Sequence, residues 1–161
     1  MKKIILSFLV IFLGSCVASN PDLMTPSEII IHNNIAGSAQ VNVVGSNERI
    51  IPNESFRQAV ENALLQSGLF TGDAKEYRLN VSVLAIENPL VGVNLTAELR
   101  VRWVLFDVDQ GQEKFNEVIA TEYTATMGDS LLAAQRMTIA NENAAKENIR
   151  NALQSISNNV E

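Results

Sequence analysis

Apolar and polar side chains alternate along the middle of the chain, and this alternation predicts β-strands. Over residues 95–106 the odd positions are apolar, from Leu95 to Leu105, whereas the even positions begin with polar side chains. A strand turns successive side chains to opposite faces, so one face of this segment is expected to be buried and the other solvated. Residues 77–86 alternate in the same way, and residues 40–45 do so in part. These segments are predicted to be strands of one sheet.

The turn after residue 106 predicts a hairpin with a defined register. Residues 109–111 (Asp-Gln-Gly) suit a three-residue loop with its glycine in the left-handed conformation. Such a loop would pair Val108 with Gln112 and, further along, Leu99 with Thr121. A two-residue loop would shift the register and set Leu99 against a glutamate, which is a worse match for a buried face. Turn chemistry and apolar pattern therefore favour the longer loop.

Apolar residues at helical spacing predict two amphipathic helices. In residues 54–67 they recur every four residues from Phe56, with Asn53 as the expected N-cap and Gly68 as the residue that ends the helix. A second apolar stripe, rich in alanine, runs over residues 137–156 and predicts a long C-terminal helix that lies close to the sheet. Its N-cap is expected in the Gly-Asp-Ser sequence at 128–130, and Glu142 and Lys146 are expected to pair on its solvent side.

The order strand, helix, strand, long hairpin, helix predicts an α+β fold. We expect a two-layer sandwich, with a mostly antiparallel sheet of about four strands and two helices packed on one face. This single domain is assigned to residues 39–158. Residues 16–38 contain prolines and small polar side chains and are predicted to form a flexible tether, with 29–31 as a candidate short edge strand.

The N-terminus has the layout of a secretory signal peptide, assigned to residues 1–15. Lys2 and Lys3 precede an apolar run over residues 4–13, and small residues follow it. The run is shorter than the roughly 20 apolar residues that a membrane-spanning helix needs.

The end of this segment, Leu13-Gly14-Ser15-Cys16, resembles the bacterial lipobox. The resemblance implies diacylglycerol on the Cys16 thiol, cleavage before Cys16 and often a third acyl chain such as palmitate on the new amine. Two or more acyl chains anchor a protein firmly, because each buried CH₂ contributes about 0.8 kcal/mol. In such lipoproteins of Gram-negative bacteria, an aspartate after the cysteine favours retention in the inner membrane. Position 17 is a valine, so the resemblance favours the outer membrane if the source is Gram-negative. The alternative is a plainly secreted chain with a chance cysteine.

Charge and residue counts narrow the function classes. Removal of Lys2 and Lys3 with the signal takes the formal charge from −6 to −8, which argues against nucleic acid as a partner. Cys16 is the only cysteine and His32 the only histidine, so no disulfide and no Cys/His metal cluster can form. A catalytic triad would have to use His32, and no nucleophile-elbow motif lies near it. We therefore expect no enzyme, no metal and no cofactor.

Two candidate contact surfaces stand out. Arg78, Arg100 and Arg102 fall on the predicted open face of the sheet, where they could bind phosphate or carboxylate groups such as those of a lipid headgroup or glycolipid. The alternative is that they only neutralise neighbouring carboxylates.

The second candidate is the turn at 89–93, whose apolar residues Leu90, Val91 and Val93 could press into a membrane or a partner's groove, or fold back on the core. The amide side chains of the last helix are predicted to form a solvated polar face, with a partner surface as the alternative. They are Asn141, Asn143, Asn148, Asn151 and Gln154.

The lipobox and the order of elements together are similar to the small α+β outer-membrane lipoproteins of bacteria, including, in layout, those of lipopolysaccharide assembly. The resemblance implies a noncatalytic, lipid-anchored interaction or assembly module of the cell envelope, attached to the outer membrane, facing the periplasm and bound to an envelope protein. The alternative is a periplasmic carrier of lipid or glycolipid. A deep apolar cavity between helices and sheet would favour the carrier, and a filled core would favour the module.

Overall fold

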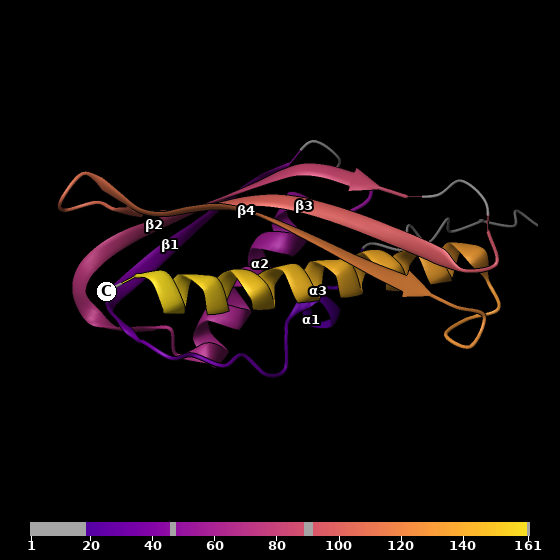
Figure 1. The fold of residues 1–161 in the computed structure, drawn as a ribbon, viewed down its shortest axis with the longest axis horizontal. Helices are drawn as coiled ribbons and strands as arrows, with labels where there is room; N and C mark the ends of the chain where they lie inside the picture. The colour runs from indigo at the N-terminus through magenta and orange to yellow at the C-terminus, as the bar shows by residue number, and fades with distance from the viewer. Residues whose placement is uncertain (1–18, 46–47, 89–91, 161) are drawn as a thin grey trace, which may run out of the picture.

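The computed structural model describes residues 19–45, 48–88 and 92–160. The elements in chain order are α1 (Pro21–Met24), β1 (Ile35–Gly45), α2 (Asn53–Ser67), β2 (Phe70–Glu87), β3 (Leu95–Asp107), β4 (Gln112–Ala125) and α3 (Ala133–Asn159) (Figure 1).

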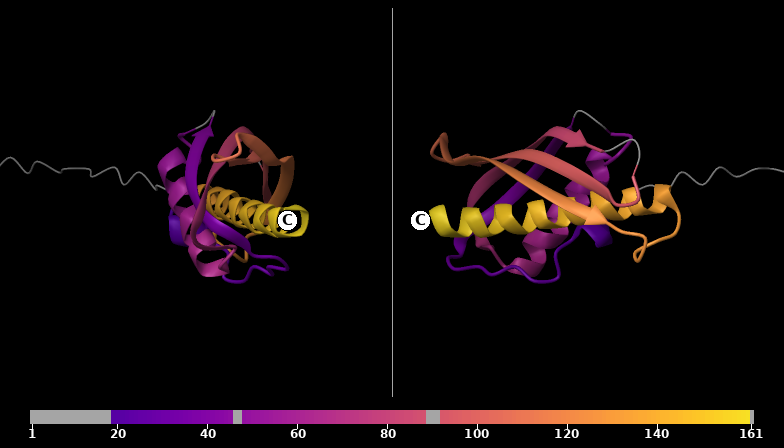
Figure 2. Two further views of the ribbon diagram at one scale, coloured as in Figure 1. Left: turned by 90° about the vertical axis from the view of Figure 1, so that its left-hand side faces the viewer. Right: turned by 45° about the vertical axis from the view of Figure 1, so that its right-hand side comes forward.

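The described strands form one mixed sheet in the order β1-β2-β3-β4. β1 and β2 are parallel and joined through α2, whereas β2, β3 and β4 are antiparallel neighbours. The helices lie on one side of the sheet, which curls over α3 when viewed along that helix (Figures 1 and 2). The predicted two-layer α+β class is confirmed, with the parallel β1–β2 pair as the one departure from an antiparallel sheet.

The predicted hairpin register is confirmed along most of its length. Leu99 pairs with Thr121 and Trp103 with Glu117, as the apolar pattern required. Correct register matters because a slip of one residue would turn every side chain of β4 to the wrong face. The inward side chains of β3 are consequently buried, and its outward ones are exposed or half-buried.

The pairing near the turn differs from the prediction. Asp107, not Val108, pairs with Gln112, so the loop has four residues, and a bulge at Lys114 restores the predicted register. The Asp107 carboxylate stabilises this wider turn by accepting the N–H of Gln110 at 2.8 Å. The glycine of the loop has a φ of 64°, the left-handed conformation expected from the sequence.

The ends of α2 confirm one predicted cap and correct the other. Gly68 has a φ of 63° and donates its N–H to the carbonyl of Leu64, as a glycine C-cap does. At the other end Pro52 holds the N-cap position and Asn53 is already helical, so its side chain donates to Glu48 at 2.5 Å and caps nothing.

The start of α3 also differs from the prediction. The helix begins at Ala133 after Leu132, which contributes no side-chain cap. Residues 126–130 form a separate hydrogen-bonded turn, because Asp129 accepts the N–H of Thr126 at 2.7 Å. The Gly-Asp-Ser sequence therefore forms a turn before the helix and does not cap it.

The predicted tether is too long, because residues 19–34 lie on the folded body. Met24 is fully buried, and Ile29 and Ile31 pack against the core without forming the candidate edge strand. Further along, the Ser157 hydroxyl accepts the N–H groups of His32 at 2.8 Å and Asn33 at 2.9 Å. Apolar burial and buried acceptors on α3 therefore order a segment whose composition predicts flexibility.

Side chains fill the space between helices and sheet. Trp103 and Phe56 are both completely buried, with ring centroids 6.3 Å apart. The alanines of the α3 stripe are also fully buried, which brings the helix backbone close to β3 and β4, as predicted. They are Ala140, Ala144, Ala145 and Ala152.

Candidate functional site

The predicted site residues fall into two groups. Cys16, Leu90 and Val91 lie outside the described residues. Arg78, Arg100, Arg102 and Val93 lie within them, and each is exposed.

The three arginines share the open face of the sheet but do not form one cluster. Arg100 and Arg102 are neighbours on the outward side of β3. Arg78 on β2 lies opposite Phe106, four residues further along β3 than Arg102. At about 3.3 Å per residue this places Arg78 more than 10 Å away along the strands. The predicted basic stripe is therefore divided.

Arg100 neutralises a carboxylate of the same face. Its guanidinium donates to Glu87 at 2.8 Å, and the two side chains are 56% and 60% exposed. Exposed pairs of this kind contribute about 0–1 kcal/mol. The alternative of charge neutralisation thus holds for Arg100, with Glu87 on β2 as the partner.

The same end of the open face is acidic. Glu87, Glu98 and Glu122 lie opposite one another on three neighbouring strands. Beside them is a shallow hollow of about 220 Å³ whose lining includes Glu98, Arg100 and Glu122. Like charges placed directly opposite are unfavourable, so the adjacent guanidinium offsets part of this repulsion.

Arg102 lies in a different environment. Ser82 and Val118 are its partners in the register, and Val44 lies opposite Ser82 on β1. Within the described part of the chain, no carboxylate lies within salt-bridge distance of Arg102. Val44 and Val118 are about half exposed. This row therefore combines a charge with apolar surface, a composition common in protein interfaces.

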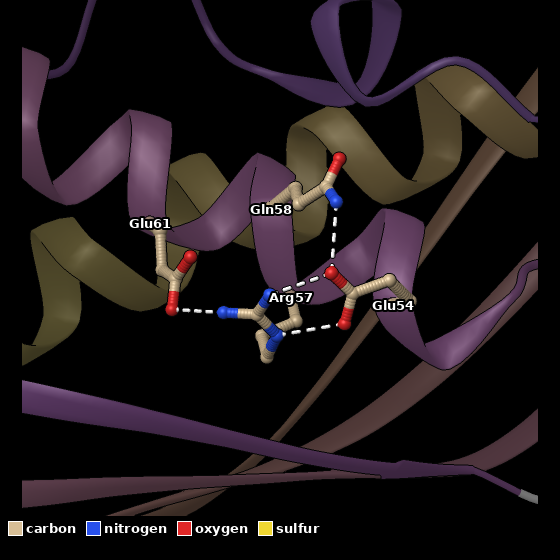
Figure 3. Close-up of polar contacts among 4 residues, drawn as sticks. All are labelled: Glu54, Arg57, Gln58 and Glu61. Carbon is tan, nitrogen blue, oxygen red and sulfur yellow. Dashed lines mark hydrogen bonds and ion pairs between the residues drawn. The ribbon is translucent and has the colours of Figure 1, made fainter.

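A network of charges lies on the outer surface of α2, away from the sheet. Arg57 donates to both Glu54 and Glu61, and Gln58 donates to Glu54 (Figure 3). The Arg57 guanidinium, with help from the Gln58 amide, lowers the pKa of Glu54 to about 2. These residues are three or four positions apart on one helix, so the network stabilises α2 and supplies no reactive group.

Several polar groups on α3 are buried, which the sequence did not predict. Asn148 is fully buried, and its amide accepts from Trp103 and donates to the carbonyl of Ile119. Asn141 is also buried, and its amide bonds within α3 to Met137. The predicted solvated amide face is therefore wrong for these two residues, because both side chains are buried. The burial of Asn148 could have been predicted from the sequence, since it lies four residues from both Ala144 and Ala152 in the apolar stripe.

Glu142 is likewise buried and does not form the predicted solvent-side pair with Lys146. Its carboxylate accepts the backbone N–H of Asn20 at 2.8 Å. Burial raises the pKa of Glu142, against a lowering by that hydrogen bond and by the charge of Lys146. This carboxylate fastens the N-terminal segment to α3.

The described residues also bear on metal binding and on membrane spanning. No group of three or more His, Cys, Asp or Glu side chains among residues 19–45, 48–88 and 92–160 is placed to hold a metal ion. Within the same ranges, no helix is long and apolar enough to span a bilayer.

The sequence matches no family model and no curated protein. Its fold, however, is shared with solved bacterial structures. Protein XCC0632 from Xanthomonas campestris has a TM-score of 0.63 at 12% identity, over 82% of this chain and 93% of that chain. A candidate lipoprotein from Caulobacter crescentus has a TM-score of 0.52 at 21% identity, over 73% and 88%. A minor lipoprotein from Acinetobacter baumannii has a TM-score of 0.50 at 14% identity, over 75% and 92%. At these identities the likeness shows a common fold.

Proposed function

We propose that this chain is a lipid-anchored, noncatalytic lipoprotein of the bacterial cell envelope. It would hold or assemble a protein partner at the outer membrane, with its domain in the periplasm. The observation that carries the proposal is the lipobox sequence ending at Cys16, directly after a charged and then an apolar segment. The fold supports it, because the similar structures include a candidate lipoprotein and a minor lipoprotein.

The position of Ser19 adds a physical constraint. Its hydroxyl donates to the carbonyl of Ile50 at 2.9 Å, so the chain is bound to the folded body at a residue three positions after Cys16. Three extended residues span about 10 Å. An acylated Cys16 would thus hold the domain against the bilayer surface, where it can meet partners embedded in the same membrane.

The filled core favours an interaction module over a lipid carrier. A carrier needs an apolar cavity that accepts acyl chains. The inner face of the sheet is instead covered by fully buried side chains from α2 and α3, such as Phe56, Ile149 and Leu153. The open face, with Arg102 between Val44 and Val118, is the surface we assign to the protein partner.

The titrating groups support a noncatalytic role. In the described part of the chain, hydrogen bonds from Thr126 lower the pKa of Asp129, and burial raises the pKa of Glu142. Each is explained by a contact that shapes the fold, whereas catalytic groups converge on a cleft.

Metabolic labelling tests the anchor. The chain is expressed in a Gram-negative host with radiolabelled palmitate, beside Cys16→Ser and the matched control Ser15→Ala, which keeps a small residue before the cleavage site. Label is expected on the wild type and the control, and density fractionation should place both with the outer membrane. No label on the wild type, or unchanged fractionation of the Cys16→Ser variant, contradicts the proposal.

Site-specific crosslinking tests the partner. A photoreactive residue replaces Arg102 on the open face or, as a control, exposed Leu65 on α2. An envelope protein is expected to crosslink at position 102 and not at 65. Recovery of no envelope protein above background from position 102 contradicts the assigned surface.

A further inference from the structure

Loops border one end of the sheet. β3 starts there opposite the last residue of β4, and β2 finishes nearby, whereas β1 finishes further back, with Gly45 opposite Val83. The segment that leads into α3 is at the same end (Figure 1). We call this the loop end and define it by residues 92–94 and 126–132. Ser19 is bound through Ile50, in the segment between β1 and α2.

The loop end carries a group of exposed apolar side chains. Val93 is 65% exposed, Met127 51%, Leu131 79% and Leu132 68%. The pairing of Leu95 with Ala125 brings the segments that hold Val93 and Met127 to the same edge. Single exposed apolar residues are ordinary, but a group on adjoining loops indicates a contact surface.

Hydrogen bonds hold the two leucines in place. The Arg136 guanidinium is buried and donates to the carbonyls of Ser130 at 2.8 Å and Leu131 at 3.0 Å. The Ser130 hydroxyl accepts the N–H of Leu132 at 3.1 Å. A turn fixed in this way cannot fold its leucines back on the core, so their exposure is a built feature of the fold.

The length of chain before Ser19 identifies what lies opposite this surface. Cys16 precedes Ser19 by three residues, or about 10 Å of extended chain. Leu132 lies ten residues from Glu142, the side chain that binds Asn20, which corresponds to about 15 Å along α3. Measured from Asn20, the four residues back to Cys16 can extend to about 14 Å, which is close to this distance, so a bilayer that holds acyl chains on Cys16 can also meet the leucines.

Charge does not supply the attraction. Glu87, Glu98, Glu122 and Asp129 lie at or next to the loop end, against Arg100, which is paired with Glu87. A surface of this balance has no preference for anionic lipid. Binding would come from apolar burial, which salt does not screen as it screens surface charges.

We propose that Val93, Met127, Leu131 and Leu132 form a second membrane contact, which enters the surface of the same bilayer that holds the acyl chains of Cys16. This inference rests on the proposed lipid anchor. The anchor supplies affinity, and the second contact fixes orientation, because two attachment points restrict rotation where one does not. The domain then stands with the start of α3 at the membrane and the rest of that helix pointing away from it.

Depth-dependent fluorescence tests the contact on the full acylated chain. Because the Cys16 thiol would be blocked by acylation, a cysteine introduced by Leu131→Cys or Leu132→Cys takes a polarity-sensitive dye selectively. The labelled chains are placed in phosphatidylcholine vesicles that carry lipid-borne quenchers. Leu65→Cys is the matched control, since Leu65 is 82% exposed near the other end of α2.

The dyes at 131 and 132 are expected to shift to the blue and to be quenched several-fold more than the dye at 65, at low and high salt alike. Equal quenching at all three positions overturns the inference while leaving the anchor intact. Failure of the wild-type chain to float with vesicles overturns the anchor and the inference together. A third outcome is a blue shift of the dye at 131 that disappears on dilution of the protein and occurs without quenching by lipid. It would indicate contact with a second copy of the chain and would also overturn the inference.

Discussion

The indole N–H of Trp103 donates a 2.9 Å hydrogen bond to the side-chain carbonyl of Asn148, and both side chains are fully buried. The amide group of Asn148 also donates to the carbonyl of Ile119 at 2.9 Å and to the hydroxyl of Thr121 at 3.2 Å. One side chain of α3 thus bonds to two neighbouring strands, β3 and β4. A buried amide with this many partners fixes the position of the helix on the sheet.

Replacement of that amide should destabilise the fold. Asn148→Ala removes the acceptor of the buried Trp103 N–H and a donor to the Ile119 carbonyl, which we expect to cost about 2–4 kcal/mol in the free energy of unfolding. Asn151→Ala is the matched control, because Asn151 is exposed on the same helix and should change stability by less than about 0.5 kcal/mol. Urea unfolding measures both, and equal stability of the two variants would contradict the role of Asn148.

The hydroxyl of Ser157 should hold the N-terminal segment to α3. Ser157→Ala removes the acceptor of the His32 and Asn33 N–H groups, with an expected cost of about 1–3 kcal/mol. Limited proteolysis should then cleave faster within residues 26–34 than in the wild type. Ser155→Ala is the control, since the Ser155 hydroxyl bonds to exposed Glu117. Unchanged cleavage in the Ser157 variant would count against this fastening.

Glu142 should make stability depend on pH in a defined direction. Because the folded-state pKa is raised above the ordinary 4.5, the folded state disfavours the carboxylate, and stability falls as pH rises above about 4.5 through the folded-state pKa. Glu142→Gln removes this effect and can still accept the Asn20 N–H. The variant should therefore gain stability over the wild type at pH 7, and the gain should vanish below about pH 4.

Urea unfolding at pH 7 and at pH 4 measures the difference. Glu113→Gln is a control at an exposed position of β4. A gain for the Glu142 variant that is the same at both pH values would show that the carboxyl group contributes through packing and not through its ionisation.

Gly37 should tolerate no side chain. It has a φ of 144°, and a Cβ atom there would lie 2.5 Å from the carbonyl oxygen of Lys75. Gly37→Ala must move the β1–β2 backbone and is expected to cost about 2–4 kcal/mol. Gly111→Ala is the control, because φ is also positive but open space surrounds the Cβ position, so about 1 kcal/mol is expected. Thermal unfolding that ranks the two variants in reverse would contradict the steric argument.

The sequence predicted the sheet well because alternation and turn chemistry are local signals. The register that pairs Leu99 with Thr121 follows from the buried face of β3 and from the glycine at 111. The four-residue loop and the bulge at Lys114 were missed, because their effects on the register cancel. The packed segment 19–34 was missed because the α3 residues that bind Asn20 and His32 are more than 100 residues away.

The candidate contact surfaces were predicted only in part. Strand alternation correctly placed Arg78, Arg100 and Arg102 on the open face, but strand pairing decides which of them meet. Arg100 pairs with Glu87 on β2. The sequence predicted a register only for the hairpin of β3 and β4, so it could not identify this partner. Leu131 and Leu132 carried no helical or strand period, so their exposure became visible only with the turn that holds them.

Ser157 and Glu142 have a consequence for the order of biogenesis. Both accept backbone N–H groups of residues 20–33, yet both belong to α3, which follows every other described element in the chain. Segment 19–34 can therefore fasten to the body only after α3 has been synthesised. Under the lipid anchor proposed above, this order would leave segment 19–34 unfastened during the modification of Cys16.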